Sequence, residues 1–435
     1  VAFNGDDLRL KLYLVDDNGY SLVNIVPIDI LGSKIHVLDR NIEDSFNGVT
    51  NLKIELQNLG NKNAEYFSIE LIPDLQNYEI RSDGFYEIYN FGEYESIFIE
   101  DFLVSFNDDI IPGSIIPIEF LLSSEDGYER ILTSNITFGQ RRESDPIGPD
   151  NHGYYIYDSG DIEYDLAPEY DWIEIAAPDN SNKLNIVDYG NGEFPGSYTY
   201  GSEVVDLPFT FTFYGIDYNQ IVVNANGWIS FGDFKMYSFR NYSIPGAGGP
   251  SPMVAAFWDD LKTGDGGYIH YVAQNDKVII QWENLRTYDN NGAYRETFQI
   301  ILYNKEFFPD TDTGDSEIKI QYKDFNNTSD GYYPNGDTPT HGCYSTIGIE
   351  NHLGNTGIEY TFNNIYSPGA SRLEDGSAIF ITTRTNSSSS MGDINLDGNI
   401  DILDLVSLAN AILSDVYILS GDLNQDGTLD ILDIV

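Results

Sequence analysis

An alternation of apolar and polar residues with a period of two runs through most of the first 385 residues, and it limits the fold more than any other feature. Such alternation places one face of a strand in a core and the other in solvent, whereas a helix needs a period near 3.6. The runs are short, rich in aromatic and β-branched residues, and separated by Asn-Gly, Asp-Gly and Pro-Gly turn signals. The sequence therefore predicts a mainly β chain built from tandem antiparallel β-sandwiches.

The chain is predicted to have four parts. Residues 1–143 contain about eight such runs and are expected to form one sandwich. A polar joint with Pro and Gly, from Gln140 to Asn151, is expected to be a linker. About twelve further runs predict a larger sandwich at 144–385, and a flexible Ser-rich linker at 386–391 leads to a tail at 392–435.

Charge and cysteine content exclude several classes of protein. With 22 Lys and Arg against 70 Asp and Glu, the net charge is −48, so nucleic acid and anionic membrane surfaces should repel the chain. Cys343 is the one cysteine, which rules out an internal disulfide and a cysteine-based zinc site. No apolar run is long enough for a membrane-spanning segment.

The acidity also suggests a location for the protein. Strong self-repulsion suits a calcium-rich or salty exterior, where cations screen it, so we expect an extracellular or cell-surface, secreted protein. The start Val-Ala-Phe-Asn-Gly lacks a basic and apolar leader. We therefore expect a mature chain, or a processed piece of a larger precursor.

The tail contains a 13-residue acidic motif twice, beginning at Gly392 and at Gly421 and offset by 29 residues. Oxygen-bearing side chains stand at loop positions 1, 3, 5, 9 and 12, with Gly at position 6. An EF-hand-type loop wraps calcium in this way, and its carboxylates repel one another until a cation neutralises them. We therefore predict two calcium ions whose binding is coupled to folding of the tail. The predicted ligands are Asp393, Asn395, Asp397, the carbonyl of Asn399, Asp401 and Asp404 in the first loop, and Asp422, Asn424, Asp426, the carbonyl of Thr428, Asp430 and Asp433 in the second.

In the same tail the apolar period changes to 3.6, which predicts a helix with one apolar face, formed by Leu405, Leu408, Ala409, Ile412 and Leu413. From Gly392 onward the tail resembles a type I dockerin, whose duplicated loop-helix halves bind calcium and, in cellulosomes, a cohesin partner. The second repeat stops at Val435 with its helix almost missing, so we expect it to be truncated or completed by another segment. The resemblance implies partner recognition at loop positions 10 and 11, here Ile402, Leu403, Ile431 and Leu432. These apolar pairs fit docking on the protein's own sandwich as well as on a cohesin-like module.

Four strings in the larger sandwich resemble the nidogen-like extracellular domain: 223–232, 253–260, 278–282 and 297–303. This resemblance implies a noncatalytic surface or adhesion module. Residues 51–73 resemble immunoglobulin-like, adhesion-related modules of secreted bacterial proteins. The wider arrangement is similar to the accessory regions that follow the protease domain in secreted subtilisin-like and gingipain-like proteins.

Other clusters have simpler explanations. Asp259, Asp260 and Asp265 share a Gly-rich turn and could hold a third cation, but turn-forming carboxylates are commoner in such a sequence. Asp310, Asp312 and Asp315 form a poorer cluster, because Gly314 does not fall where an EF-type loop needs it. His341 and Cys343 lie two residues apart without the other parts of a cysteine-protease site. We therefore predict no catalytic residues and no enzyme activity.

The sequence favours a noncatalytic, calcium-binding adhesion or structural protein that assembles into a surface layer or filament through its tail or its edge strands. One alternative is the accessory C-terminal region of a secreted protease, which would mediate attachment to substrate or surface. A second alternative is a dockerin-bearing subunit that binds a cohesin.

Overall fold

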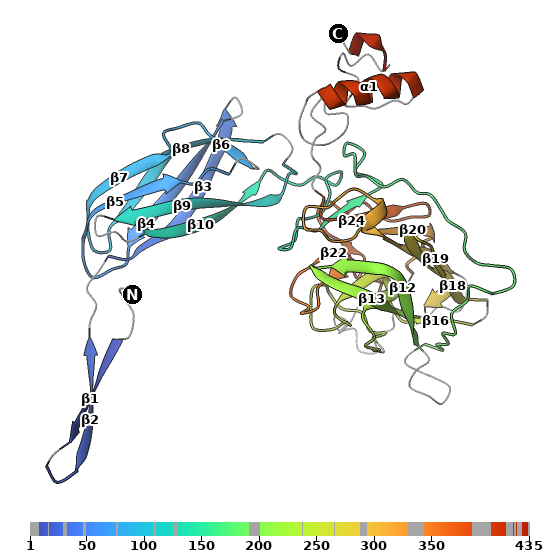
Figure 1. Cartoon of the computed structure of the whole chain (residues 1–435), viewed down its shortest axis with the longest axis horizontal. Helices are drawn as coiled ribbons and strands as arrows, with labels where there is room; N and C mark the ends of the chain where they lie inside the picture. The colour runs from blue at the N-terminus through green and yellow to red at the C-terminus, as the bar shows by residue number, and fades with distance from the viewer. Residues whose placement is uncertain are drawn as a thin grey trace. The chain divides into compact units, whose positions relative to one another are not determined.

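The computed structural model describes residues 8–15, 17–28, 33–46, 49–74, 77–107, 110–124, 129–190, 201–236, 238–264, 266–287, 294–328, 343–384, 402–414, 421, 423 and 429–433. The chain divides into two compact units, Val1–Gln140 (unit 1) and Arg141–Val435 (unit 2). Both contain antiparallel sheets, so the prediction of a mainly β chain is confirmed (Figure 1).

Unit 1 contains a β-sandwich of two four-stranded sheets, with strand orders β3-β4-β8-β6 and β10-β9-β5-β7. Residues from both sheets form one core, in which Leu56, Ile69 and Val104 are fully buried. The strands are β3 (Ile35–Phe46), β4 (Val49–Asn58), β5 (Ala64–Leu71), β6 (Tyr78–Ile80), β7 (Phe85–Phe91), β8 (Ser96–Phe106), β9 (Ser114–Ser124) and β10 (Glu129–Phe138).

The first two predicted runs are strands, but they are not part of this sandwich. β1 (Leu8–Val15) and β2 (Ser21–Ile28) form a two-stranded sheet of their own (Figure 1). β6 and β7 contribute the strands that the sequence did not predict. β6 has only three residues, which is too short for an alternation to show. In β7 the exposed positions also carry large aromatic residues, Phe85 and Tyr89, so apolar and polar residues do not alternate clearly.

Unit 2 contains two seven-stranded antiparallel sheets around a shared core. One has the order β11-β24-β20-β19-β18-β16, with β17 also paired to β18, and the other has the order β12-β13-β14-β15-β21-β22-β23. The strands are β11 (Tyr155–Asp158), β12 (Ser202–Phe213), β13 (Ile216–Asn224), β14 (Trp228–Phe231), β15 (Met253–Trp258), β16 (Leu261–Lys262), β17 (Tyr268–Ala273), β18 (Lys277–Thr287), β19 (Glu296–Tyr303), β20 (Ile318–Asp324), β21 (Thr346–Glu350), β22 (Gly357–Phe362), β23 (Ile365–Tyr366) and β24 (Ala378–Thr382).

The turn between β13 and β14 explains one of the sequence strings. Gly227 has a φ of +76°, and a Cβ there would lie 1.9 Å from the carbonyl oxygen of Phe257, so only glycine fits. The side chain of Asn226 accepts the backbone N–H of Leu261 at 3.0 Å. The indole N–H groups of Trp228 and Trp258 both donate to the carbonyl of Ser238. These residues fasten a turn and a covering loop to the sheet.

One of the twelve runs in the larger sandwich, Trp172–Ile175, has the aromatic and β-branched residues that predict a strand. It is not a strand, although it is held against the sheet. Gln281, Gln299 and Gln321, fully buried on adjacent strands β18, β19 and β20, form a ladder of side-chain hydrogen bonds, at 2.8 Å and 3.0 Å between neighbouring amides. The ladder bonds the backbone of Asp171, Ile173 and Ile175. Side-chain amides thus replace the ladder of a neighbouring strand.

Most of the joint expected to be a linker, Gln140 to Asn151, packs into unit 2. Ile147 belongs to the core and exchanges two backbone hydrogen bonds with Ile156. Asp145 is fully buried, and Arg142 donates to its carboxylate at 2.6 Å. The boundary between the two units falls at the start of this joint, after Gln140. The rest of the joint is held by an ion pair and by single apolar anchors, which leave no periodic signal.

The described part of the tail contains the helix α1 (Ile402–Ser414) and the 3-10 turn η3 (Ile431–Asp433). The expected apolar face of the helix is only partly right. Leu408 is buried, but Leu405 is 46% exposed. The side chain of Leu413 lies outside the described residues.

Candidate functional site

Most of the predicted calcium ligands lie outside the described residues. This group comprises Asp393, Asn395, Asp397, Asn399, Asp401, Asp422, Asn424, Asp426 and Thr428. The ligands that the structure describes are Asp404, Asp430 and Asp433.

Asp404 and Asp433 occupy position 12 of the two loops, and both are buried. Each side chain is 2% exposed, Asp404 in the first turn of α1 and Asp433 at the end of η3. Burying a carboxylate is costly unless hydrogen bonds or a cation compensate its charge. Equal burial at equivalent positions of the two repeats is what an inward-pointing twelfth ligand requires.

The end of the second loop is a tight turn. The N–H of Asp430 donates to the carboxylate of Asp433 at 2.8 Å, and the N–H of Asp433 donates to the carbonyl of Asp430 at 3.2 Å. This turn brings loop positions 9 and 12 together, and both positions supply oxygen ligands in an EF-hand-type loop. The described donor set is therefore carboxylate oxygen, the type that calcium prefers.

The proposed partner-binding positions are described only in part. Ile431 is 68% exposed, so it is accessible to a partner. The side chains of Ile402, Leu403 and Leu432 lie outside the described residues.

At the candidate third cation site, the described contacts include hydrogen bonds within the turn. The carboxylate of Asp259 accepts the N–H of Asp260 at 2.8 Å, and Gly264 forms a β-bridge with Gly267. Asp265 lies outside the described residues. The described contacts are those of turn-forming carboxylates.

The Asp310, Asp312 and Asp315 cluster does not converge. Asp310 and Asp312 are exposed, whereas Asp315 is buried, and its carboxylate lies 2.7 Å from Nε2 of His152. Asp315 also accepts the N–H of Gly215. The contact between His152 and Asp315 joins residues 163 positions apart, which sequence spacing does not reveal. Because Asp315 also bonds Gly215, it connects the start of unit 2 to the β12–β13 hairpin.

Two further buried carboxyls meet near β11. The carboxylate of Asp158 accepts from the hydroxyl of Tyr360 and the N–H of Ser371, both at 2.8 Å. Asp161 accepts the N–H of Asp158 at 2.7 Å. Burial and the nearby charge of Asp158 raise the pKa of Asp161 to about 8. Asp161 therefore favours its neutral form at neutral pH, as a structural rather than a ligating group.

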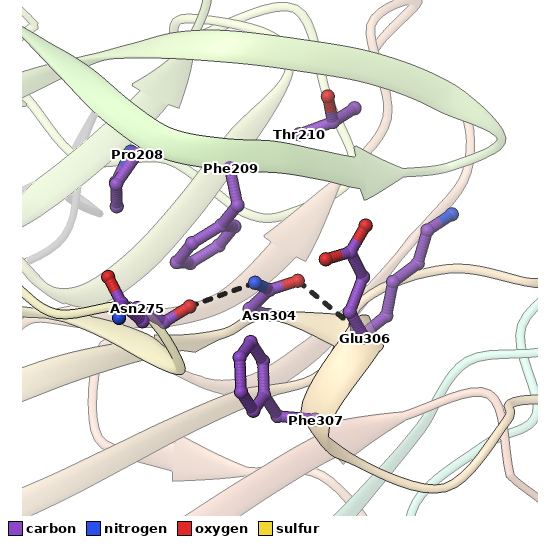
Figure 2. Close-up of a pocket in the computed structure, with 8 residues that line it drawn as sticks. Pro208, Phe209, Thr210, Asn275, Asn304, Glu306 and Phe307 are labelled. Carbon is purple, nitrogen blue, oxygen red and sulfur yellow. Dashed lines mark hydrogen bonds between the residues drawn. The ribbon is translucent and has the colours of Figure 1, made fainter.

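A small pocket of about 400 Å³ opens between β12 and the 3-10 turn η1 (Lys305–Phe307). Figure 2 shows the rings of Phe209 and Phe307 on opposite sides of Asn304. The amide of Asn304 donates to the carbonyl of Asn275 at 2.9 Å and accepts the N–H of Glu306 at 3.1 Å. The side chain of Asn304 thus holds two turns together. Lys305 and Glu306 also line the pocket, and the ammonium of Lys305 donates to the hydroxyl of Thr212 and to the carbonyl of Gly314.

The described residues add little to the catalytic candidates. The N–H of Cys343 donates to the side chain of Asn363, and His341 lies outside the described residues. Within the described ranges, no group of three or more His, Cys, Asp or Glu side chains is arranged to hold a metal ion. None of the helices in the described part of the chain has the length and apolar character needed to cross a membrane.

Comparison with known protein families gives one match. Residues 197–389 match a family described as NIDO related. All four strings that resemble the nidogen-like domain lie inside this range, so the nidogen-like character of the larger sandwich is confirmed. No curated protein matches the chain.

Proposed function

We propose that the chain is a noncatalytic, extracellular attachment protein whose β modules carry a C-terminal element shaped by two calcium ions. A NIDO-related domain is an extracellular-type module, which supports the proposed location and the proposed role in surface adhesion or structure. The contacts of the acidic and polar clusters in the described part of unit 2 are those of turns and strand fastenings.

The burial of both twelfth-position carboxylates is the observation that carries the calcium proposal. Asp404 and Asp433 are 29 positions apart, in repeated loops, and each is 2% exposed. Calcium would supply the positive charge that offsets the clustered carboxylates of each loop. The residues that would hold it are the twelve predicted ligands, with Asp404 and Asp433 closing the two loops.

Calorimetric titration of the full chain with calcium tests this proposal. We expect two ions per chain, and one ion for either Asp404→Asn or Asp433→Asn, because each variant loses a charged ligand from one loop. Val406→Ala, at an exposed position of α1, should still bind two ions. Unchanged stoichiometry and affinity in both aspartate variants would contradict the assignment of the loops.

Light scattering during the same titration tests the structural role. A protein that assembles through its calcium-set tail should gain mass as calcium is added and lose it again on chelation. A mass that stays monomeric through millimolar calcium would restrict the proposal to attachment by single chains.

A further inference from the structure

The β1–β2 hairpin exposes large apolar side chains that a strand in a sandwich would bury in its core. Leu10 and Leu12 on β1 are 48% and 38% exposed, and Leu22 and Val26 on β2 are 62% and 37% exposed. In the strand order the hairpin forms a sheet with no third strand among the described residues. An isolated two-stranded hairpin is at best marginally stable in water.

The hairpin resembles the β9–β10 hairpin that ends the unit 1 sandwich in its register and in the apolar alternation of its first strand. Shifted by 108 positions, the string Leu-Lys-Leu-Tyr-Leu-Val-Asp-Asp-Asn-Gly-Tyr at 10–20 aligns with Ile-Glu-Phe-Leu-Leu-Ser-Ser-Glu-Asp-Gly-Tyr at 118–128. The same shift of 108 positions converts the register of β1–β2 into that of β9–β10. Leu8 pairs with Ile28 and Val15 with Ser21, as Ile116 pairs with Ile136 and Ser123 with Glu129. The register therefore agrees over both strands, whereas the sequences share the alternation of apolar residues in the first strand and the Gly-Tyr pair that follows it.

In unit 1 the strand that matches β1 is β9, and its inward residues lie in the core. Ile116, Ile118, Phe120 and Leu122 face the interior and are 1–2% exposed. The other edge of β9 pairs with β5, where Leu71 opposes Phe120 and Phe67 opposes Ser124. The positions in β1 that match the four inward residues are all leucine: Leu8, Leu10, Leu12 and Leu14.

We propose that β1–β2 is an assembly hairpin that closes an immunoglobulin-like sandwich other than unit 1. The edge of β1 that pairs with no described strand joins a strand of the β5 type, and the leucine face enters that sandwich's core. The partner is an immunoglobulin-like module that lacks its own closing hairpin. This module would give β1 the two things that unit 1 gives β9. These are an open antiparallel strand edge, as on β5, and an apolar core that receives alternate residues.

Unit 1 itself, in this chain or in a second copy, does not offer that place. Both edges of β5 are already paired, with β7 from Ala64 to Glu70 and with β9 from Phe67 to Leu71. A second copy would have to release β9 before it could accept β1. The proposal therefore commits to a separate module rather than to self-exchange.

A length-matched exchange within the full chain tests whether the hairpin fits such a place. Residues 116–136 are replaced by the sequence of residues 8–28, so that the β1–β2 sequence takes the position of β9–β10. We expect unit 1 of this chimera to keep a cooperative thermal transition. The matched control carries aspartate at positions 118 and 120, in place of the two transplanted leucines, and should lose that transition.

The chimera and its aspartate control each test whether the hairpin fits the place of β9–β10. Loss of the transition in the leucine chimera, or survival of the transition in the aspartate control, would overturn the proposal. Light scattering of the unmodified chain tests the choice of partner. A monomer agrees with the proposal, whereas a dimer that disappears in the Leu10→Asp, Leu12→Asp variant would overturn it in favour of a second copy.

Discussion

At the scale of single residues, Asp161 is a fully buried carboxyl with uneven hydrogen bonding. Its Oδ2 accepts the N–H of Asp158, whereas its Oδ1 is buried and has no hydrogen-bond partner among the described residues. Because the charged form is poorly solvated there, folding favours the protonated acid. The pKa of about 8 in the folded chain lies well above the ordinary aspartate value of 3.8.

This raised pKa predicts how stability depends on pH. Between pH 4 and pH 8 the unfolded chain releases this proton and the folded chain retains it. The free energy of unfolding of unit 2 should therefore fall as pH rises, by about 1.4 kcal/mol per pH unit from this group. Asp161→Asn, which is neutral at every pH, should remove this contribution and make the slope shallower in denaturant titrations with EDTA present. Glu296 and Asp188, whose pKa values burial raises to about 7 and about 6, keep part of the slope. The exposed Asp165→Asn should keep the slope, and equal slopes in the two variants would contradict the role of Asp161.

At the scale of elements, the glutamine ladder is the device that holds the 171–175 segment on the outer face of β18–β20. Gln299 is its centre, since it donates to Gln281 at 2.8 Å and to the carbonyl of Ile173 at 2.5 Å, and accepts from Gln321 at 3.0 Å. Removing a central partner leaves buried amide and carbonyl groups unpaired on three strands or segments.

Gln299→Leu should therefore lower the free energy of unfolding by about 3 kcal/mol while keeping the side-chain volume. Hydrogen exchange should accelerate first at the amides of Asp171 and Ile175, which bond to the neighbouring glutamines. Gln220→Leu removes an exposed hydrogen bond to Asp206 and should change stability by less than about 1 kcal/mol. Unchanged exchange at the two amides in Gln299→Leu would show that the segment is held by other contacts.

The same elements show what the sequence can predict. Alternation locates strands such as β4, in which buried and partly buried residues alternate, because burial on one face is a local property. The Trp172–Ile175 segment alternates without being a strand, because its apolar residues pack on the sheet while glutamine side chains satisfy its backbone. The proposed calcium loops are likewise local patterns, since their predicted ligands fall within twelve residues, and they stay a prediction. The contact between His152 and Asp315, in contrast, depends on the tertiary fold.

At the scale of the whole molecule, the chain has two separate cores. The buried cluster of unit 1 runs from Ile35 to Ile136, and the main buried cluster of unit 2 runs from Ile147 to Ile381. The two clusters share no residue, and the division into compact units falls between them, after Gln140. Each core is large enough to fold its own sandwich cooperatively.

The two units should accordingly unfold in two thermal transitions that respond to different substitutions. Leu56→Ala, at a fully buried site of unit 1, should destabilise that unit by about 2–5 kcal/mol and lower one transition. Ile280→Ala, at a fully buried site of unit 2, should lower the other transition by a comparable free energy. Calorimetry in EDTA separates this measurement from the proposed binding of calcium to the tail. If either substitution moved both transitions together, the two sandwiches would be one cooperative unit, and the separate cores would not determine how the chain unfolds.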